Sequence, residues 1–243
     1  MSYSELTIEN PSLLKRFSHT KRFDIALELL AVERNDEILD YGTGDGFMLK
    51  KLLSANPQSV VGYEPMESQY KQLEEFISKQ GIDNVAIIGD LSCIETSRFD
   101  KICCLEVLEH LTEDNQILVL TSIKCLLKNG GRAVVSVPIE VGLSGLLKNI
   151  ARCILRQAHP NTTFLNIFKS FLCLKIERGQ EAYISSHIGF DYHDLEGLIV
   201  SVGFEIKSKH YSPLKGFRGF INSQIFFVLE SEVNTALNTD AAR

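Results

Sequence analysis

The sequence lacks any unbroken apolar run of about 18 residues, the length needed to cross a bilayer as a helix. Its first ten residues, MSYSELTIEN, lack the basic and then apolar pattern of a secretory signal peptide. We therefore expect a cytoplasmic protein. The chain also has no low-complexity tract, and its 44% hydrophobic and 23% charged residues are typical of a globular protein with a sizeable core.

CxxC pairs are absent as well, although the chain has six cysteines: Cys93, Cys103, Cys104, Cys125, Cys153 and Cys173. Without that spacing, zinc-binding and redox motifs are not indicated. Cys103 and Cys104 are adjacent in a predicted strand and would point to opposite faces of a sheet. We expect buried free thiols rather than disulfides or zinc ligands.

Positive charge is scarce, with a net charge of −6, but it gathers between residues 143 and 190. That segment has two acidic residues, Glu177 and Glu181, and six basic ones, Lys148, Arg152, Arg156, Lys169, Lys175 and Arg178. Such a segment is either a surface for an anionic partner or a solvated face. Since the pI is near 5.6 and no basic domain is appended, a nucleic-acid partner is not expected.

Apolar runs rich in β-branched residues alternate with amphipathic stretches from about residue 35 to residue 140, as in βαβ units. The predicted strands are Glu37–Asp40, Val60–Glu64, Val85–Gly89, Lys101–Leu105 and Arg132–Val137. Helical patterns occupy 11–31, 66–81 and 115–131, the last ending in a glycine pair suited to a C-cap. These features predict an α/β fold with a doubly wound, mostly parallel sheet.

The alternation stops after Pro138 and resumes with a helical pattern at 192–203 and two strand patterns at 204–212 and 222–231. The connection between these strands is too short for a crossover helix, so they should pair antiparallel. The prediction is one domain over 1–232, with a seven-stranded Rossmann-like sheet, an antiparallel last strand and a helical lid insertion at 143–190. Residues 233–243 are expected to form a flexible tail.

A glycine loop follows the first predicted strand in ILDYGTGDG, residues 38–46. Its glycines, Gly42, Gly44 and Gly46, are one residue closer together than the G-x-G-x-x-G loop that cradles a pyrophosphate. Asp40 and Asp45 would repel a diphosphate but attract a cationic ligand. Glu64, at the end of the second strand, is suited to accept both hydroxyls of an adenosine ribose.

These segments resemble the class I S-adenosylmethionine-dependent methyltransferases, closely over residues 36–140 and more loosely beyond. The resemblance implies that the loop surrounds the methionine half of the cofactor. It assigns the cofactor site to the first motif (Asp40, Tyr41, Gly42, Gly44, Gly46), to Glu64 and Pro65 in VVGYEP, to Asp90 and Leu91 in IIGDLS, and to Glu106 in FDKICCLEVLEHL. Single turns or caps could explain each residue separately.

The stretch EVLEHL places Glu106, Glu109 and His110 at helical spacing, and His187 could add a fourth ligand. Two carboxylates and an imidazole predict a divalent-metal site such as Mg²⁺. The pattern resembles that of ubiquinone-pathway O-methyltransferases and small-RNA 2′-O-methyltransferases, in which a Glu-x-x-Glu-His run and a later histidine bind the ion. Many relatives have such a run without a metal. No base is evident, and only His187 and His193 are candidates.

The predicted lid begins with an amphipathic helix at 142–157, followed by a second apolar stretch at 162–176. It could be a cap packed on the domain, a peripheral membrane contact through 143–157, or a surface that steers an anionic acceptor. An interleaved aromatic and basic platform for single-stranded RNA is not indicated, because Phe164, Phe168 and Phe171 fit a buried helix face equally well.

The main hypothesis is S-adenosylmethionine-dependent O-methylation of a small or lipid-linked metabolite. The alternatives are a metal-assisted RNA 2′-O-methyltransferase, an NAD-dependent oxidoreductase and an inactive cofactor-binding subunit.

Overall fold

A seven-stranded sheet in the order β3-β2-β1-β4-β5-β7-β6 organises the protein. The computed structural model describes residues 13–92, 94–154, 161–179, 181, 183–214, 217, 219 and 222–231, and for 13–20 the backbone alone. The predicted tail at 233–243 lies outside these residues. The strands are β1 (Glu37–Tyr41), β2 (Ser59–Tyr63), β3 (Ala86–Ile88), β4 (Phe99–Leu105), β5 (Leu127–Pro138), β6 (Phe204–Ser212) and β7 (Gln224–Ser231).

The strand directions confirm the predicted fold class. β1 to β5 pair in parallel, whereas β7 lies antiparallel between β5 and β6. The order reverses between β1 and β4, so the carboxyl ends of these two strands mark the place where such sheets bind ligands.

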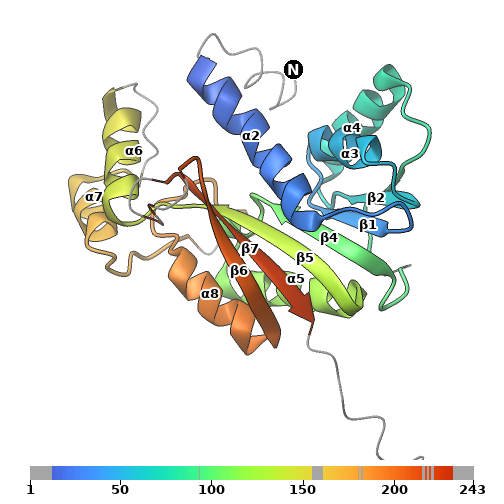
Figure 1. Ribbon diagram of the computed structural model, residues 1–243. Helices are drawn as coiled ribbons and strands as arrows, with labels where there is room; N and C mark the ends of the chain where they lie inside the picture. The colour runs from blue at the N-terminus through green and yellow to red at the C-terminus, as the bar shows by residue number, and fades with distance from the viewer. Residues whose placement is uncertain are drawn as a thin grey trace, which may run out of the picture.

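Helices cover both faces of the sheet (Figure 1). One face packs against α2 (Leu13–Leu30), α3 (Phe47–Ser54) and α4 (Glu67–Gln80), and the other against α5 (Glu113–Leu126) and α8 (Tyr192–Ser201). Because successive strand residues alternate between faces, Ile38 belongs to the first core and Leu39 to the second. Adjacent Cys103 and Cys104 divide in the same way, as predicted.

Two details differ from the predicted elements. The helix before β5 ends at Leu126, and the glycine pair lies inside β5, where a shift of register interrupts pairing with β4. A Cβ on Gly131 would lie 2.8 Å from the carbonyl oxygen of Lys128, so the shift needs glycine there. Among the described residues the cysteines are free, as expected, but Cys125, Cys153 and Cys173 are exposed rather than buried.

The segment predicted as a lid, called the lid below, contains α6 (Gly142–Ile154) and α7 (Phe164–Phe171), which stand beyond the carboxyl end of β5 and contact each other (Figure 1). The helix α6 buries Ser144, Gly145 and Asn149, and exposes Leu147, Ile150 and Ile154. Of the three alternatives for the segment, a cap whose apolar face packs on the domain therefore does not describe α6. The reason is close approach: a Cβ on Gly145 would lie 2.1 Å from the carbonyl oxygen of Glu140, so only a small-residue face fits.

Candidate functional site

The glycine loop between β1 and α3 turns sharply through three residues with positive φ, Gly42 (79°), Gly44 (58°) and Gly46 (80°). The amide N–H groups of Gly42 and Thr43 both donate to the carbonyl of Tyr63, which ties the loop to the end of β2. A Cβ on Gly42 would meet Val107 at 2.5 Å, whereas the nearest atom to a Cβ on Gly44 lies 3.8 Å away. The loop is thus packed at Gly42 and open at Gly44, which leaves room for a ligand.

Gly46 provides a direct test of the loop. A Gly46→Ala substitution places a Cβ 2.7 Å from Leu73 and forces an L-residue to φ 80°, so we expect it to lower the melting temperature and weaken cofactor binding. Gly81→Ala is the matched control, because Gly81 has a similar φ of 61° but nothing within 4 Å of its Cβ position. Both variants carry the backbone strain, but only Gly46→Ala carries the clash, so the difference between their melting temperatures measures the effect of the clash. Equal losses would show that the packing around Gly46 is unimportant.

Glu64 connects the ends of β1 and β2. It is 4% exposed, and its two carboxylate oxygens accept the amide N–H groups of Gly44 and Met66, each at 2.9 Å. Burial raises the pKa of Glu64, and these two hydrogen bonds oppose the rise. Each oxygen keeps a second lone pair, so the carboxylate is placed to accept two further hydroxyl groups.

Asp40 lies at the end of β1 in a dry environment. Burial raises its pKa to about 7, against the lowering effect of hydrogen bonds that include the Cys103 thiol at 3.2 Å. Its second oxygen is buried and has no hydrogen-bond partner within the described part of the chain. A buried carboxylate with an unsatisfied oxygen favours a positively charged ligand beside it. This is the fit expected for the methionine half of the cofactor.

The other predicted cofactor residues lie at the same edge of the sheet with different degrees of exposure. Tyr41 is buried and its ring packs edge-on against Tyr63. Pro65 is exposed and Leu91 is half-buried. Asp90 is exposed, and two hydrogen bonds from Ser92 lower its pKa.

Glu106 follows β4 with φ 57°, a left-handed conformation that is uncommon for a residue other than glycine. One carboxylate oxygen accepts from Gln224 at 2.7 Å, and the other lies 3.5 Å from the Arg22 guanidinium of α2. Glu106 therefore links α2 to the sheet at the site. Sequence reasoning missed this network, because Arg22 and Gln224 are distant from Glu106 along the chain.

Glu109, His110 and His187 come together without Glu106. The turn Leu108–His110 (η1) starts only after the left-handed residue, which breaks the predicted helical spacing from Glu106. One ligand-type atom from each of the three residues lies within 4.8 Å of the others. Burial, with the charge of Glu106, raises the pKa of Glu109 well above its usual range. Burial also lowers the pKa of His110.

His193, the other histidine proposed as a base, lies elsewhere. It lies in the first turn of α8, where its ring Nδ1 is 2.7 Å from the carboxylate of Asp191. The same carboxylate accepts the His193 amide and caps the helix. This position gives His193 a structural role at the helix start.

Glu140 forms ion pairs with two basic side chains of α6. It is 1% exposed and lies 3.2 Å from Lys148, 2.7 Å from Arg152 and 3.7 Å from His187. Two of the basic residues that the sequence placed on a polar outer face therefore point inward. Arg178 also turns inward and donates to the main-chain carbonyls of Glu109 and Leu111. Arg156 lies outside the described residues.

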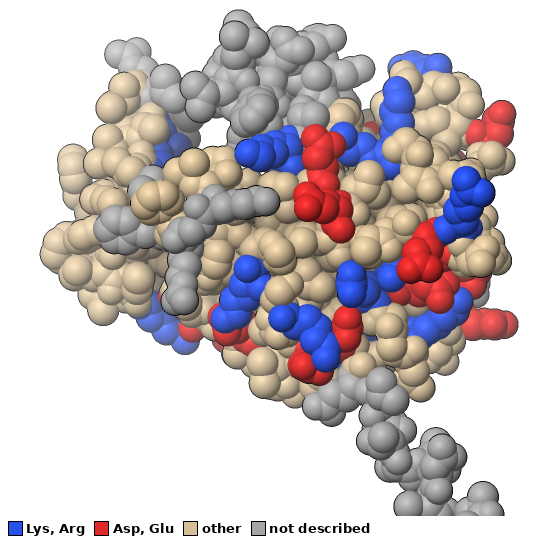
Figure 2. All heavy atoms as spheres, viewed as in Figure 1, with Lys and Arg blue, Asp and Glu red and all other residues tan. Residues whose placement is uncertain are grey.

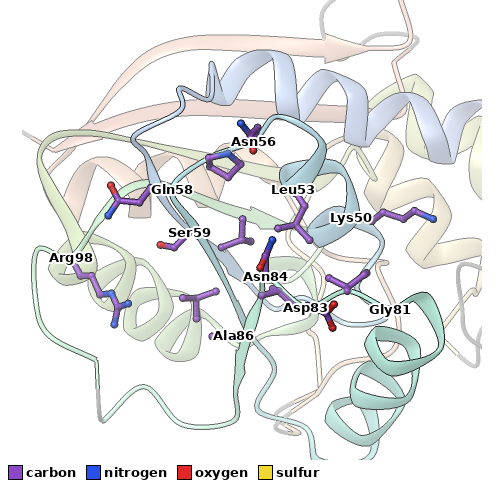
Figure 3. Close-up of a pocket in the computed structure, with 15 residues that line it drawn as sticks. Lys50, Leu53, Asn56, Gln58, Ser59, Gly81, Asp83, Asn84, Ala86 and Arg98 are labelled. Carbon is purple, nitrogen blue, oxygen red and sulfur yellow. The ribbon is translucent and has the colours of Figure 1, made fainter.

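A separate hollow lies at the opposite edge of the sheet (Figure 3). Its lining includes Ser59 and Ala86, at the amino ends of β2 and β3, together with Lys50, Asp83 and Arg98. The glycine loop and Glu64 lie at the carboxyl ends of β1 and β2. The hollow is therefore not part of the candidate site.

The sheet order, the glycine loop after β1 and the acid after β2 together define a class I S-adenosylmethionine-dependent methyltransferase. The chain belongs to the family described as the methyltransferase domain, whose model matches residues 14–170. Its cofactor is therefore S-adenosylmethionine, and the NAD-dependent alternative is removed.

Solved structures agree on the fold. The [4+2]-cyclase SpnF has a TM-score of 0.61 at 13% identity, covering 90% of this chain and 83% of its own. The N-methyltransferase NodS from Bradyrhizobium japonicum has a TM-score of 0.56 at 10% identity, covering 93% and 99%. At these identities the likeness concerns the fold alone.

Curated relatives correct one expectation from the sequence. The tRNA U34 carboxymethyltransferase of Nautilia profundicola is 30% identical over 166 residues, which are 67% of this chain and 52% of that protein. The enzyme of the same name from Campylobacter concisus is 33% identical over 98 residues, 39% and 32% of the two chains. The matches thus span about half or less of these relatives. Because the relatives are named for tRNA, our expectation of a small or lipid-linked acceptor and no nucleic acid is wrong.

No helix of the described residues is both long and apolar enough to cross a membrane.

Proposed function

We propose that this methyltransferase acts on tRNA and transfers the sulfonium-borne group of its cofactor to a nucleotide, with a uridine as the first candidate. The observation that carries the proposal is the match of 67% of the chain to a tRNA U34 carboxymethyltransferase. Three further relatives have the same name.

The cofactor residues of the proposal are those at the carboxyl ends of β1 and β2. When bound, S-adenosylmethionine supplies an electrophilic methyl group on a positively charged sulfur. Glu64 is placed to hold the ribose hydroxyls, and Asp40 to face the positive half. Transfer needs the acceptor in line with the breaking carbon–sulfur bond, and such alignment can contribute about 7–11 kcal/mol.

The lid offers a surface for nucleic-acid bases. Phe164 is 94% exposed and Phe168 59% exposed, both on α7. The sequence did not indicate an RNA-stacking platform, since these rings fit a buried helix face equally well, but in the structure they are exposed. Exposed aromatic rings stack on unpaired bases, the usual means of recognising single-stranded RNA.

Ionic contacts to phosphates should contribute less than base stacking to tRNA binding on this surface. Figure 2 shows Lys and Arg interspersed with Asp and Glu, and a mostly uncharged region over α6 and α7. Since Lys148 and Arg152 are paired with Glu140, few phosphate contacts are available there. Binding of tRNA should accordingly weaken only shallowly with added salt.

Transfer of labelled methyl from S-adenosylmethionine to a tRNA mixture tests the proposal. We expect nuclease-sensitive label in the tRNA and none in lipid extracts or free nucleosides. Digestion of the product to nucleosides separates a modified base from a ribose 2′-O-methyl group, the remaining RNA alternative. If the cofactor binds but no tRNA is labelled, the proposed substrate is wrong.

The Phe164→Ala/Phe168→Ala double variant should weaken tRNA binding at least tenfold, because base–aromatic stacking is worth about 1–3 kcal/mol per base. Both rings are exposed, so folding should be little affected. The control is Leu118→Ala on α5, which removes a 63% exposed apolar side chain far from the lid. Filter binding or fluorescence anisotropy measures the effect. Equal affinity of the double variant and wild type would exclude this face as the tRNA platform.

A further inference from the structure

Glu109, His110 and His187 form a compact cluster beside the carboxyl end of β4. The first residue is fully buried and the two histidines are half-buried. Metal–ligand bonds of about 2.0–2.2 Å place two ligand atoms of a tetrahedral ion about 3.4 Å apart. The observed separations of up to 4.8 Å would close to this range with small side-chain rotations.

Glu109 has an unusual environment for a carboxylate. It is 0% exposed, and within the described residues neither of its oxygens has a hydrogen-bond partner. The nearby Arg178 guanidinium donates to the main-chain carbonyls of Glu109 and Leu111. Its charge and that of Arg22 act on the carboxylate without a hydrogen bond to it. A buried carboxylate without hydrogen bonds is costly unless a cation compensates it.

His110 has its ring orientation and tautomer set by the main chain. Its Nδ1 lies 2.9 Å from the carbonyl oxygen of Ile184, which can only accept, so Nδ1 carries the proton. The lone pair is then on Nε2, 4.0 Å from a Glu109 oxygen. Histidine ligands of metals commonly donate their other N–H to a carbonyl in this way.

His187 is oriented by a carboxylate. Its Nδ1 lies 3.7 Å from Glu140, the buried acid that also pairs with Lys148 and Arg152. A carboxylate behind a ligating imidazole is the second common arrangement around protein metal sites. Both histidines therefore have the support that ligation requires.

We propose that Glu109, His110 and His187 bind one divalent transition-metal ion, through one carboxylate and two imidazoles. Two histidines and one carboxylate are typical of zinc and iron(II) sites with open coordination positions. Mg²⁺ prefers oxygen ligands, and Glu106, which would supply a second carboxylate, is held by Gln224 and Arg22. The site thus differs in both membership and metal from the magnesium site that the spacing predicts.

An ion at this cluster, beside the carboxyl end of β4, would be able to hold an acceptor oxygen and lower its pKa. This part of the inference rests on the proposed function, but the binding of the ion does not.

Metal binding is tested with the full chain, stripped by chelator, in the absence of cofactor and tRNA. Co²⁺ is the probe, because its visible absorption reports ligand type. We expect one Co²⁺ per chain, displaced by Zn²⁺ but not by millimolar Mg²⁺. Removing a residue that hydrogen-bonds to a metal ligand typically lowers the metal affinity 10–100-fold. Removing a ligand itself should cost at least as much, so Glu109→Gln and His187→Ala should each weaken Co²⁺ binding by at least roughly 100-fold. His193→Ala is the control, since that exposed histidine is paired with Asp191.

Thermal unfolding separates loss of the site from loss of the fold. Zn²⁺ should raise the Tm of wild type but not that of Glu109→Gln. Without metal, Glu109→Gln should melt near the wild-type temperature, because an amide of nearly the same size replaces the buried carboxyl group. Absence of saturable Co²⁺ and Zn²⁺ binding, or binding unchanged in both variants, would overturn the metal site. Methyl transfer to tRNA could still occur in that case, so the two proposals fail separately.

Discussion

Glu140→Ala is expected to lower the free energy of unfolding by about 3–5 kcal/mol, the usual cost of removing one partner from a buried ion pair. The carboxylate is 1% exposed and accepts from both Lys148 and Arg152. Without it, two cations that are turned inward have no counter-charge. Because both belong to α6, the lid should detach before the sheet unfolds.

The pH dependence of stability provides a second readout. Burial alone would raise the pKa of Glu140, but Lys148, His187 and Arg152 outweigh it and hold the pKa below its usual range. Its contribution is therefore fully present above the unfolded-state pKa of about 4.3, and is lost as the pH falls towards the folded-state value. Wild type and Glu140→Ala should differ at pH 7 and converge in acid.

Urea unfolding at several pH values measures both effects. The control is Glu177→Ala, which removes an exposed acid from the same segment. A loss below about 1 kcal/mol at pH 7, the range of surface ion pairs, would show that Glu140 is hydrated and that its network does not hold the lid.

The meeting of the predicted cofactor residues at one edge of the sheet was predictable because its signals are local. The carboxyl ends of neighbouring parallel strands lie at the same edge of a sheet, so the parallel pairing of β1 and β2 is enough to bring Asp40 and Glu64 close together. The hydrogen bond from Gly44 to Glu64 joins two motifs that the sequence shows separately.

The lid was not predictable in the same way. Amphipathic periodicity shows that Leu147 and Ile150 share a face, but not whether that face is buried. The deciding contact is the close approach of Gly145 to the Glu140 carbonyl, which is a property of the assembled structure. The inward turn of Lys148 and Arg152 follows from it, so these two charges of the basic segment are taken up by Glu140 and do not face an anionic partner.

Glu106 shows a further limit of prediction from the sequence. The helical spacing of EVLEHL assumes a helix from its first residue, whereas Glu106 adopts φ 57° and the turn begins at Leu108. Long-range partners, Gln224 on β7 and Arg22 on α2, hold that conformation. The metal-type cluster consequently contains one carboxylate instead of two.

Glu64→Gln is expected to weaken S-adenosylmethionine binding about 100-fold, or roughly 3 kcal/mol at 1.4 kcal/mol per tenfold change. Both oxygens of Glu64 accept main-chain N–H groups, from Gly44 and Met66. An amide has one acceptor atom, so its NH₂ group must face one of these N–H donors. The glycine loop would then move away from β2, and one acceptor for the ribose hydroxyls would be lost.

Glu67→Gln is the matched control, because Glu67 is only three residues away, mostly exposed, and paired with Lys71 on the surface of α4. Isothermal titration with S-adenosylmethionine and with its demethylated product measures both variants. Loss of ribose contacts should weaken the two ligands equally, since both contain the same adenosine, whereas a change at Asp40 should affect mainly the positively charged one. Affinity within about threefold of wild type would place the ribose elsewhere, because a change that small is below 1 kcal/mol.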